Sequence, residues 1–243
     1  MASVSEHYAK HLGSIYIWMA GGVESAVKRG AAEIETIHAL SPDGSVAVDL
    51  GAGFGMHSLP LAHQGFSVIA IDTCTELLEE LRRRRDNLPI QTIEDDLLEF
   101  RRHLTTEAQI VLCMGDTLTH LPDSESVLKL ISEVAESLMI GGRFIITFRD
   151  YSQALTGEQR FIPVRSDDSR ILTCYLEYAD SHVTVHDILH ELDASGWHLR
   201  VSSYRKLRLV PDWICTALES SGFEVRREPG LAGMVRLVST RVK

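Results

Sequence analysis

The 243-residue sequence lacks the features of several specialised protein classes. No apolar run approaches the roughly 18 residues that cross a bilayer. The four cysteines are widely spaced and form no CxxC pair, which argues against a disulfide framework or a zinc site. The opening "MASVSEHYAKHL" lacks the charged-then-apolar layout of a secretory signal. We therefore expect a cytoplasmic protein with no membrane partner.

Positive charge is also scarce, because the chain carries a net charge of -10 at pH 7. A polyanion is usually met by a basic face, so this balance argues against a nucleic-acid partner. The one basic run, "RRRR" at 82–85, follows a helical pattern with early acids, and we interpret it as a solvated helix end. No internal repeat, low-complexity stretch or metal-ligand spacing is present.

What the chain does have is a regular alternation of strand-like and helix-like segments up to residue 150. This alternation predicts an α/β fold with a parallel sheet covered by helices on both faces. The predicted strands are 45–50, 66–72, 89–96, 108–116 and 141–150, and the predicted helices between them include 55–65, 74–87 and 123–140.

The pattern changes after residue 158. Three strand-like runs, "RILTCYLEYAD", "HVTVHDILHEL" and "GWHLRVSSYRKLRL", are separated by turn-forming residues, which predicts an antiparallel β meander. A helix at 211–222 and two closing strands follow. We expect a single domain over 1–243, with an N-terminal helical cover at 1–40 and the meander as an insert or lid at 159–210.

The segment "VAVDLGAGFG", residues 46–55, ends a predicted strand in a glycine-rich loop that opens a helix. Ligands of open parallel sheets bind at the carboxyl ends of the strands, where missing side chains let a ligand approach the backbone. A dinucleotide would require the spacing G-x-G-x-x-G, and here Met56 follows Gly55.

The pattern D-x-G-x-G-x-G resembles the first motif of class I S-adenosylmethionine-dependent methyltransferases. The resemblance covers the whole chain and implies a Rossmann-like seven-stranded sheet with an antiparallel last strand. It implies S-adenosylmethionine as cofactor and S-adenosylhomocysteine as product. The residues it assigns to the cofactor are Asp49 on the ammonium group, Gly51, Ala52, Gly53 and Gly55 in the loop, Asp72 with Thr73 at the ribose, and Asp96 with Leu97 at the adenine, Asp95 being the alternative to Asp96.

The segment "CMGDTLTHLPD", residues 113–123, resembles glycine/sarcosine N-methyltransferase-like enzymes. In that family this strand end lies along the methionine part of the cofactor, which implies contacts from Met114 and Gly115. Asp116-Thr117 replaces the family's Asn-Ser, so glycine itself is not implied as the acceptor. The aromatic leader, with Tyr16 and Trp18, resembles the cover of small-molecule methyltransferases, where Trp18 would reach the cofactor.

We therefore predict methyl transfer to N or O of a small polar or carboxylate-bearing acceptor. Asp116, His120 and Tyr151 are the catalytic candidates, and Arg149, Arg208 and Tyr16 are the candidates for holding the acceptor. Purely structural roles also stay open for three of these residues. His120 could pack beneath its loop, Asp116 could cap a turn, and Arg149 could pair with Asp150 on the surface. A cofactor-binding protein without turnover and an NAD-dependent oxidoreductase are the alternative functions. The sequence indicates no metal and leaves the oligomeric state open.

Overall fold

A seven-stranded sheet forms the centre of the computed structural model, which describes residues 3–35 and 44–243. The strand order is β10-β11-β5-β4-β1-β2-β3. Strand β11 runs opposite to the other six strands of this sheet, since it is antiparallel to both β5 and β10. The predicted Rossmann-like sheet with an antiparallel last strand is confirmed. The strands are β1 (Val46–Leu50), β2 (Ser67–Asp72), β3 (Ile90–Glu94), β4 (Ala108–Cys113), β5 (Leu138–Phe148), β10 (Phe223–Pro229) and β11 (Val235–Arg241).

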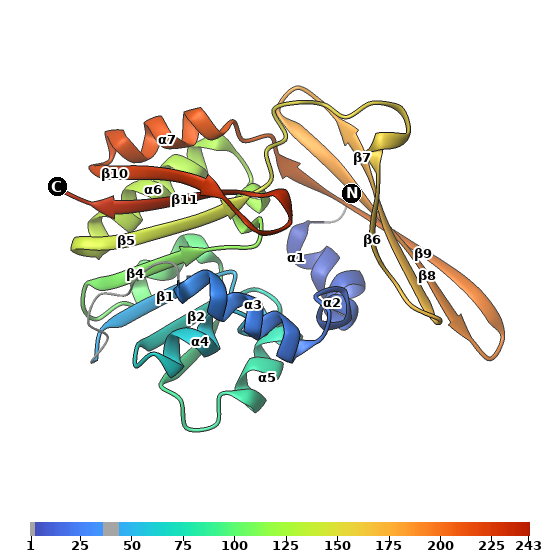
Figure 1. The fold of residues 1–243 in the computed structure, drawn as a ribbon, viewed down its shortest axis with the longest axis horizontal. Helices are drawn as coiled ribbons and strands as arrows, with labels where there is room; N and C mark the ends of the chain where they lie inside the picture. The colour runs from blue at the N-terminus through green and yellow to red at the C-terminus, as the bar shows by residue number, and fades with distance from the viewer. Residues whose placement is uncertain (1–2, 36–43) are drawn as a thin grey trace.

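Helices cover both faces of this sheet (Figure 1). On one face α6, α7 and a short 3-10 helix, η2, pack against β1, β4 and β5. On the other face α3, α4 and α5 bury their apolar side chains. Parallel strands are hydrophobic on both sides, so each face needs such a cover. The helices are α3 (Val23–Glu35), α4 (Ser58–His63), α5 (Thr75–Arg84), η2 (Leu97–His103), α6 (Ser124–Ser137) and α7 (Pro211–Ser220).

Several predicted boundaries were wrong. The helix expected to reach residue 140 ends at Ser137, because Leu138 is extended and pairs with Ala108 as the first residue of β5. The helix expected from Gly55 begins only at Ser58, because Gly55 has a φ of 91° and lies in a turn. Strand β3 stops at Glu94 and leaves the two following aspartates outside the sheet.

The second sheet has four antiparallel strands, and the sequence predicted only three. The missed strand, β6 (Phe161–Ser166), contains Pro163 and lies at the edge of the sheet, with an irregularity beside the proline. Proline is tolerated on such edges, which is why the segment escaped a prediction based on strand propensity. The other strands are β7 (Arg170–Tyr178), β8 (His182–Asp193) and β9 (Gly196–Leu207).

The N-terminal helices lie between the two sheets (Figure 1). Helix α1 contacts β9 of the small sheet. Helix α2 contacts α5, one of the helices that cover the seven-stranded sheet. They are α1 (Val4–His7), the π-helix η1 (Tyr8–Leu12) and α2 (Gly13–Met19). Residues 1, 2 and 36–40 of the expected helical cover lie outside the described residues. No helix in the described ranges combines the length and apolar character needed to cross a bilayer.

Candidate functional site

A cavity of about 260 Å³ lies at the carboxyl ends of β1, β2 and β4, where parallel sheets bind ligands. The N-terminal helices supply part of its wall. The predicted site residues that line it are Tyr16, Gly51, Ala52, Gly53, Asp72, Thr73, Asp96, Leu97, Met114, Gly115 and His120. Residues from six separate chain segments therefore meet in one place.

The glycine loop is held against β2 by its own backbone. The amides of Gly51 and Ala52 both donate to the carbonyl of Ile71, at 2.8 and 3.0 Å. Gly51 has a φ of 75°, and a Cβ there would lie 2.6 Å from the Thr117 side chain. Glycine is thus required at this position by both backbone conformation and space.

Two residues that the motif assigned to the cofactor, Asp49 and Gly55, lie behind the loop and do not line the cavity. Asp49 is buried and accepts a hydrogen bond from Ser58 Oγ at 2.6 Å. Burial raises the pKa of this carboxyl group. Gly55 faces Leu81 of α5, where an added Cβ would clash with the leucine. The geometry gives both residues a role in shaping the loop.

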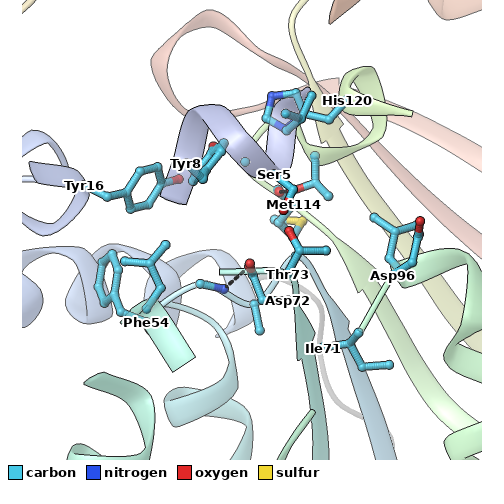
Figure 2. A pocket seen from close by; sticks show the side chains of 18 of the residues that line it. Ser5, Tyr8, Tyr16, Phe54, Ile71, Asp72, Thr73, Asp96, Met114 and His120 are labelled. Carbon is cyan, nitrogen blue, oxygen red and sulfur yellow. Dashed lines mark hydrogen bonds between the residues drawn. The ribbon is translucent and has the colours of Figure 1, made fainter. Parts of the chain in front are cut away.

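Asp72 projects into the cavity from the end of β2 (Figure 2). Its Oδ2 accepts the amide of Gly53 at 2.7 Å, and its Oδ1 accepts the amide of Cys74 at 2.8 Å. The carboxylate therefore links the glycine loop to the start of α5 while facing the cavity. Burial raises the pKa of Asp72, although these amide hydrogen bonds favour its charged form.

Both aspartates that follow β3 line the cavity, but their carboxylates are engaged differently. Asp95 forms ion pairs with Arg102 and His103, and the His103 Nε2 lies 2.6 Å from Oδ2. The hydrogen bond from His103 lowers the pKa of Asp95. Asp96 caps η2 by accepting the Leu98 amide at 2.9 Å through Oδ1. Asp96 is thus the acid with an oxygen to spare for a ligand.

Asp116 adopts a left-handed conformation, φ 76°, directly after β4 and Gly115. It does not line the cavity and is 3% exposed. Its Oδ1 accepts the Arg149 amide at 2.9 Å, and its Oδ2 lies 2.5 Å from Lys206 Nζ and 3.5 Å from the Tyr151 hydroxyl. Asp116, one of the catalytic candidates, is thus the centre of a buried polar cluster.

Lys206 comes from β9 of the small sheet, so this ion pair joins the two sheets. Burial on its own lowers the pKa of the lysine, but Asp116, Tyr204 and Tyr151 outweigh that effect and hold the pKa well above its ordinary value. Tyr151, the third catalytic candidate, lies outside the cavity lining, and burial raises its pKa to about 12. Both groups keep their protons at neutral pH.

His120 lines the cavity from the 3-10 helix η3 (Thr117–His120). Its ring lies between Tyr8 and Tyr204, with centroids 5.9 and 5.7 Å away. Its Nε2 is buried and has no hydrogen-bond partner within the described part of the chain. Burial, aided by the charge of Lys206, lowers the pKa of His120 well below its ordinary value. The imidazole is therefore neutral.

The leader contributes more to the cavity than the sequence indicated. Val4, Ser5, Tyr8 and Ala20 line it together with Tyr16. Figure 2 shows the Tyr8 and Tyr16 rings on one side of the cavity and Asp96 on the opposite side, with Asp72 between them.

Neighbouring His7 anchors the leader to the small sheet. Its Nε2 lies 2.8 Å from Asp187 Oδ2, its Nδ1 lies 2.8 Å from Ser202 Oγ, and its ring stacks on Tyr204 at 4.2 Å. All of these partners come from β8 and β9. The wall that the leader gives to the cavity is therefore fixed by the insert.

Three other predicted residues lie away from the cavity lining. Trp18 donates its indole N–H to Asp167, beside the guanidinium groups of Arg165 and Arg170. The Arg208 side chain donates to the backbone carbonyl of Tyr151 at 3.0 Å, and the Arg149 side chain donates to that of Ala232 at 3.2 Å.

Several lining residues were missed by the sequence reasoning, among them Tyr8, Phe54, Met56, His57, Leu77 and Thr117. Phe54 occupies a variable position of the glycine motif and Met56 follows its last glycine, so the motif could have marked both. Tyr8 lies eight residues before Tyr16, a spacing that puts both near one face of a continuous helix.

Comparison with known proteins agrees with this geometry. Residues 47–142, which contain most of β1, all of β2 to β4 and the glycine loop, match a family model described as a methyltransferase domain. The chain also superposes over 97% of its length on the CcbJ methyltransferase of Streptomyces caelestis, with a TM-score of 0.78, 18% identity and 98% of that chain covered. Residues 47–142 thus resemble a methyltransferase domain, and the whole chain has the fold of a solved methyltransferase.

Further methyltransferases are similar over part or nearly all of the chain. Glycine/sarcosine N-methyltransferase of Aphanothece halophytica is 31% identical over 44% of this chain and 42% of its own length. CalS10, an amino pentose methyltransferase of Micromonospora echinaspora, superposes with a TM-score of 0.77 at 18% identity, covering 96% of this chain and 97% of its own. The chain thus spans less than half the length of the curated glycine/sarcosine relative.

Proposed function

We propose that the protein is an S-adenosylmethionine-dependent methyltransferase that methylates a nitrogen of a small molecule. The observation that carries the proposal is the cavity between the glycine loop, Asp72 and Asp96, within the segment that matches the methyltransferase domain. Nitrogen is favoured over oxygen because the similar curated proteins are named as N-methyltransferases.

The residues at one end of the cavity suit the cofactor. Asp72 would accept the two ribose hydroxyls, and Asp96 with the Leu97 amide would meet the adenine edge. The backbone of Gly51 to Gly53 would lie against the methionine portion, where an added Cβ at Gly51 has no room. When bound there, S-adenosylmethionine supplies a methyl group already activated on a sulfonium.

Besides binding the cofactor, the protein would have to align the acceptor with the methyl group and exclude water from the site. Tyr8, Tyr16 and His120 would surround the acceptor, while the leader and the small sheet limit access of water. Orientation of nucleophile, methyl carbon and sulfur in a line is the main catalytic demand of such a transfer. We also propose that the protein is located in the cytoplasm.

The test is the Asp72→Ala variant. It should weaken S-adenosylmethionine binding by about 2 to 4 kcal/mol, because two charge-assisted hydrogen bonds are lost. Isothermal calorimetry measures the affinity, and thermal unfolding checks that the glycine loop, which Asp72 also holds, stays folded. The control is Asp193→Ala, which removes an exposed carboxylate in the β8–β9 turn. Equal affinity in wild type and Asp72→Ala would refute the assignment.

Turnover is tested separately from binding. The proposed enzyme should release S-adenosylhomocysteine when small amines are added. Tight cofactor binding with no release for any acceptor would favour a binding protein without catalysis.

A further inference from the structure

We propose that the outer face of the small sheet is the contact surface of a homodimer, in which a second copy of this chain packs its own outer face antiparallel against it. The outer face is the side of β7, β8 and β9 that points away from the N-terminal leader. Its residues do not line the cavity, so the dimer does not depend on methyl transfer. The burial pattern of the strands, the exposed apolar area and the charges at the two ends of the face support this arrangement.

The two sides of the small sheet differ in what covers them. Alternate residues of a strand point to opposite sides of a sheet. On β7 and β8 one set, which includes Leu172, Leu176, Val185 and Leu189, is at most 6% exposed and packs in clusters that contain residues of the leader. Figure 1 shows the leader on this side and no helix of the described chain on the other. The outer face is therefore uncovered in a single copy.

The outer face is apolar, whereas the solvent side of an antiparallel sheet is normally polar. Leu192, Trp197, Leu199 and Val201 lie on the β8–β9 hairpin, where Leu192 is opposite Trp197. Ile171 continues the patch on β7, in the same row as Leu199. Each of these five residues is between 41 and 59% exposed. We call them the apolar patch.

The area of the apolar patch suits a stable dimer. At roughly 150 to 250 Å² for a bulky side chain, five that are about half exposed present on the order of 450 Å². Half-buried neighbours in the same rows, Ile188 and His190, add to this area. The total approaches the roughly 800 Å² that each partner gives to a standard interface. Exposed patches above a few hundred Å² mark interaction sites, and the centres of homodimer interfaces are apolar.

Formal charge is confined to the two ends of the outer face. The row next to the large sheet contains Glu177, Thr184 and Arg205, side by side on β7, β8 and β9. The other end is the β8–β9 turn with the exposed Asp193. Outer positions between these ends carry no Asp, Glu, Lys or Arg. Arg205 is exposed and forms no ion pair within the described chain.

This distribution of charge fits a second copy in the antiparallel orientation. The charged row of each copy would then lie beyond the apolar patch of the other, and Arg205 would come near the partner's Asp193. In the parallel orientation the two charged rows would meet at one end. Opposite charges at the edge of a self-complementary contact align it, while such exposed pairs add little affinity. The apolar patch therefore supplies the binding, and a polyanion would find no basic face here.

The first experiment measures the mass of the full-length protein by light scattering over about a hundredfold range of concentration. We expect twice 27.1 kDa, with a dissociation constant of about 1 μM or tighter. Leu199→Glu should raise that constant about a hundredfold or more, because two like carboxylates would be buried together. The matched control is Ile140→Glu, which changes another exposed aliphatic residue, 62% exposed on β5, and should remain dimeric.

A second variant tests the patch without an added charge. Trp197→Ala should weaken the dimer about thirtyfold, because half-exposed tryptophans at the centre of an interface are typical hot spots. Circular dichroism checks that each variant keeps the fold of wild type. A dimer that Leu199→Glu and Trp197→Ala both leave intact would use another surface, and this result would overturn the proposal.

The orientation is tested by crosslinking through introduced cysteines. When Arg205 lies over the partner's Asp193, Leu199 lies near the twofold axis. Leu199→Cys should therefore be linked to its own copy by a bismaleimide that spans the roughly 10 Å between packed sheets. Arg205→Cys, at the end of the face, should not be linked, and wild type gives the background from the native cysteines. Linkage through Arg205→Cys but not Leu199→Cys would overturn the antiparallel arrangement.

A monomeric wild type over the whole concentration range overturns the dimer. If that monomer sediments with phosphatidylcholine vesicles, the apolar patch contacts lipid instead. Mass and crosslinking are measured without cofactor, so either result leaves the proposed methyl transfer untouched.

Discussion

Replacing Lys206 with Met removes the cation that joins the small sheet to the end of β4. Asp116 would keep its carboxylate in a site where it is 3% exposed, and its remaining donors among the described residues would be the Arg149 amide and the distant Tyr151 hydroxyl. Breaking a buried pair in this way costs about 3 to 5 kcal/mol. Because the amide at 2.9 Å still stabilises the charge, we expect about 3 kcal/mol, or roughly 6 to 12 °C in Tm for a chain of this size.

The assay is urea unfolding followed by circular dichroism, with Arg205→Met as the control. Arg205 neighbours Lys206 on β9 but is exposed, so its replacement should change the free energy of unfolding by less than about 0.5 kcal/mol. Adding Asp116→Asn to Lys206→Met removes the stranded charge. The double variant should therefore be about 2 kcal/mol more stable than the sum of the single effects predicts. Additivity within about 0.5 kcal/mol would refute the argument.

The same pair predicts a pH dependence. The pKa of Lys206 is raised in the folded state above its ordinary value of 10.5. The stability from this lysine is thus fully present below that value and is lost as the pH rises through the higher folded pKa. The stability gap between wild type and Lys206→Met should be constant from pH 7 to pH 9 and should shrink only at more alkaline pH.

Further predictions concern the loop, the leader and metals. Gly51→Ala should cost about 2 to 5 kcal/mol of unfolding free energy and Gly53→Ala only about 1 to 2, because Gly53 lacks the clash with Thr117; equal costs in urea unfolding would contradict this. Burial alone raises the pKa of Asp187, but hydrogen bonds from His7 and Cys174 lower it overall. Wild type should therefore lose stability as the pH falls below about 3.8, and Asp187→Asn should lose less over that range; parallel curves would argue against it. Finally, methyl transfer should survive EDTA, and restoration of lost activity by Mg²⁺ would count against a metal-free reaction.

Much of the large sheet follows from local sequence. Runs such as 45–50 and 66–72 are too short and too apolar for surface helices, and the segments between them have helical periodicity, so strand type and order follow without tertiary information. The glycine loop is equally local, since Gly51 and Gly53 adopt positive φ angles that few other residues tolerate. The placement of Asp72 at the cavity follows from its position at the end of a parallel strand.

Only the tertiary structure decided what the charged residues near the site do. Asp116, Lys206 and His120 are separated by up to 90 residues, and nothing in their local patterns states that the lysine pairs with the aspartate and leaves the histidine neutral. Side-chain partners depend on how β9 and the leader dock on the large sheet, which is set by packing of distant surfaces. Local periodicity determines which elements form, whereas the pairing of buried charges depends on distances between elements, and those exist only in the folded chain.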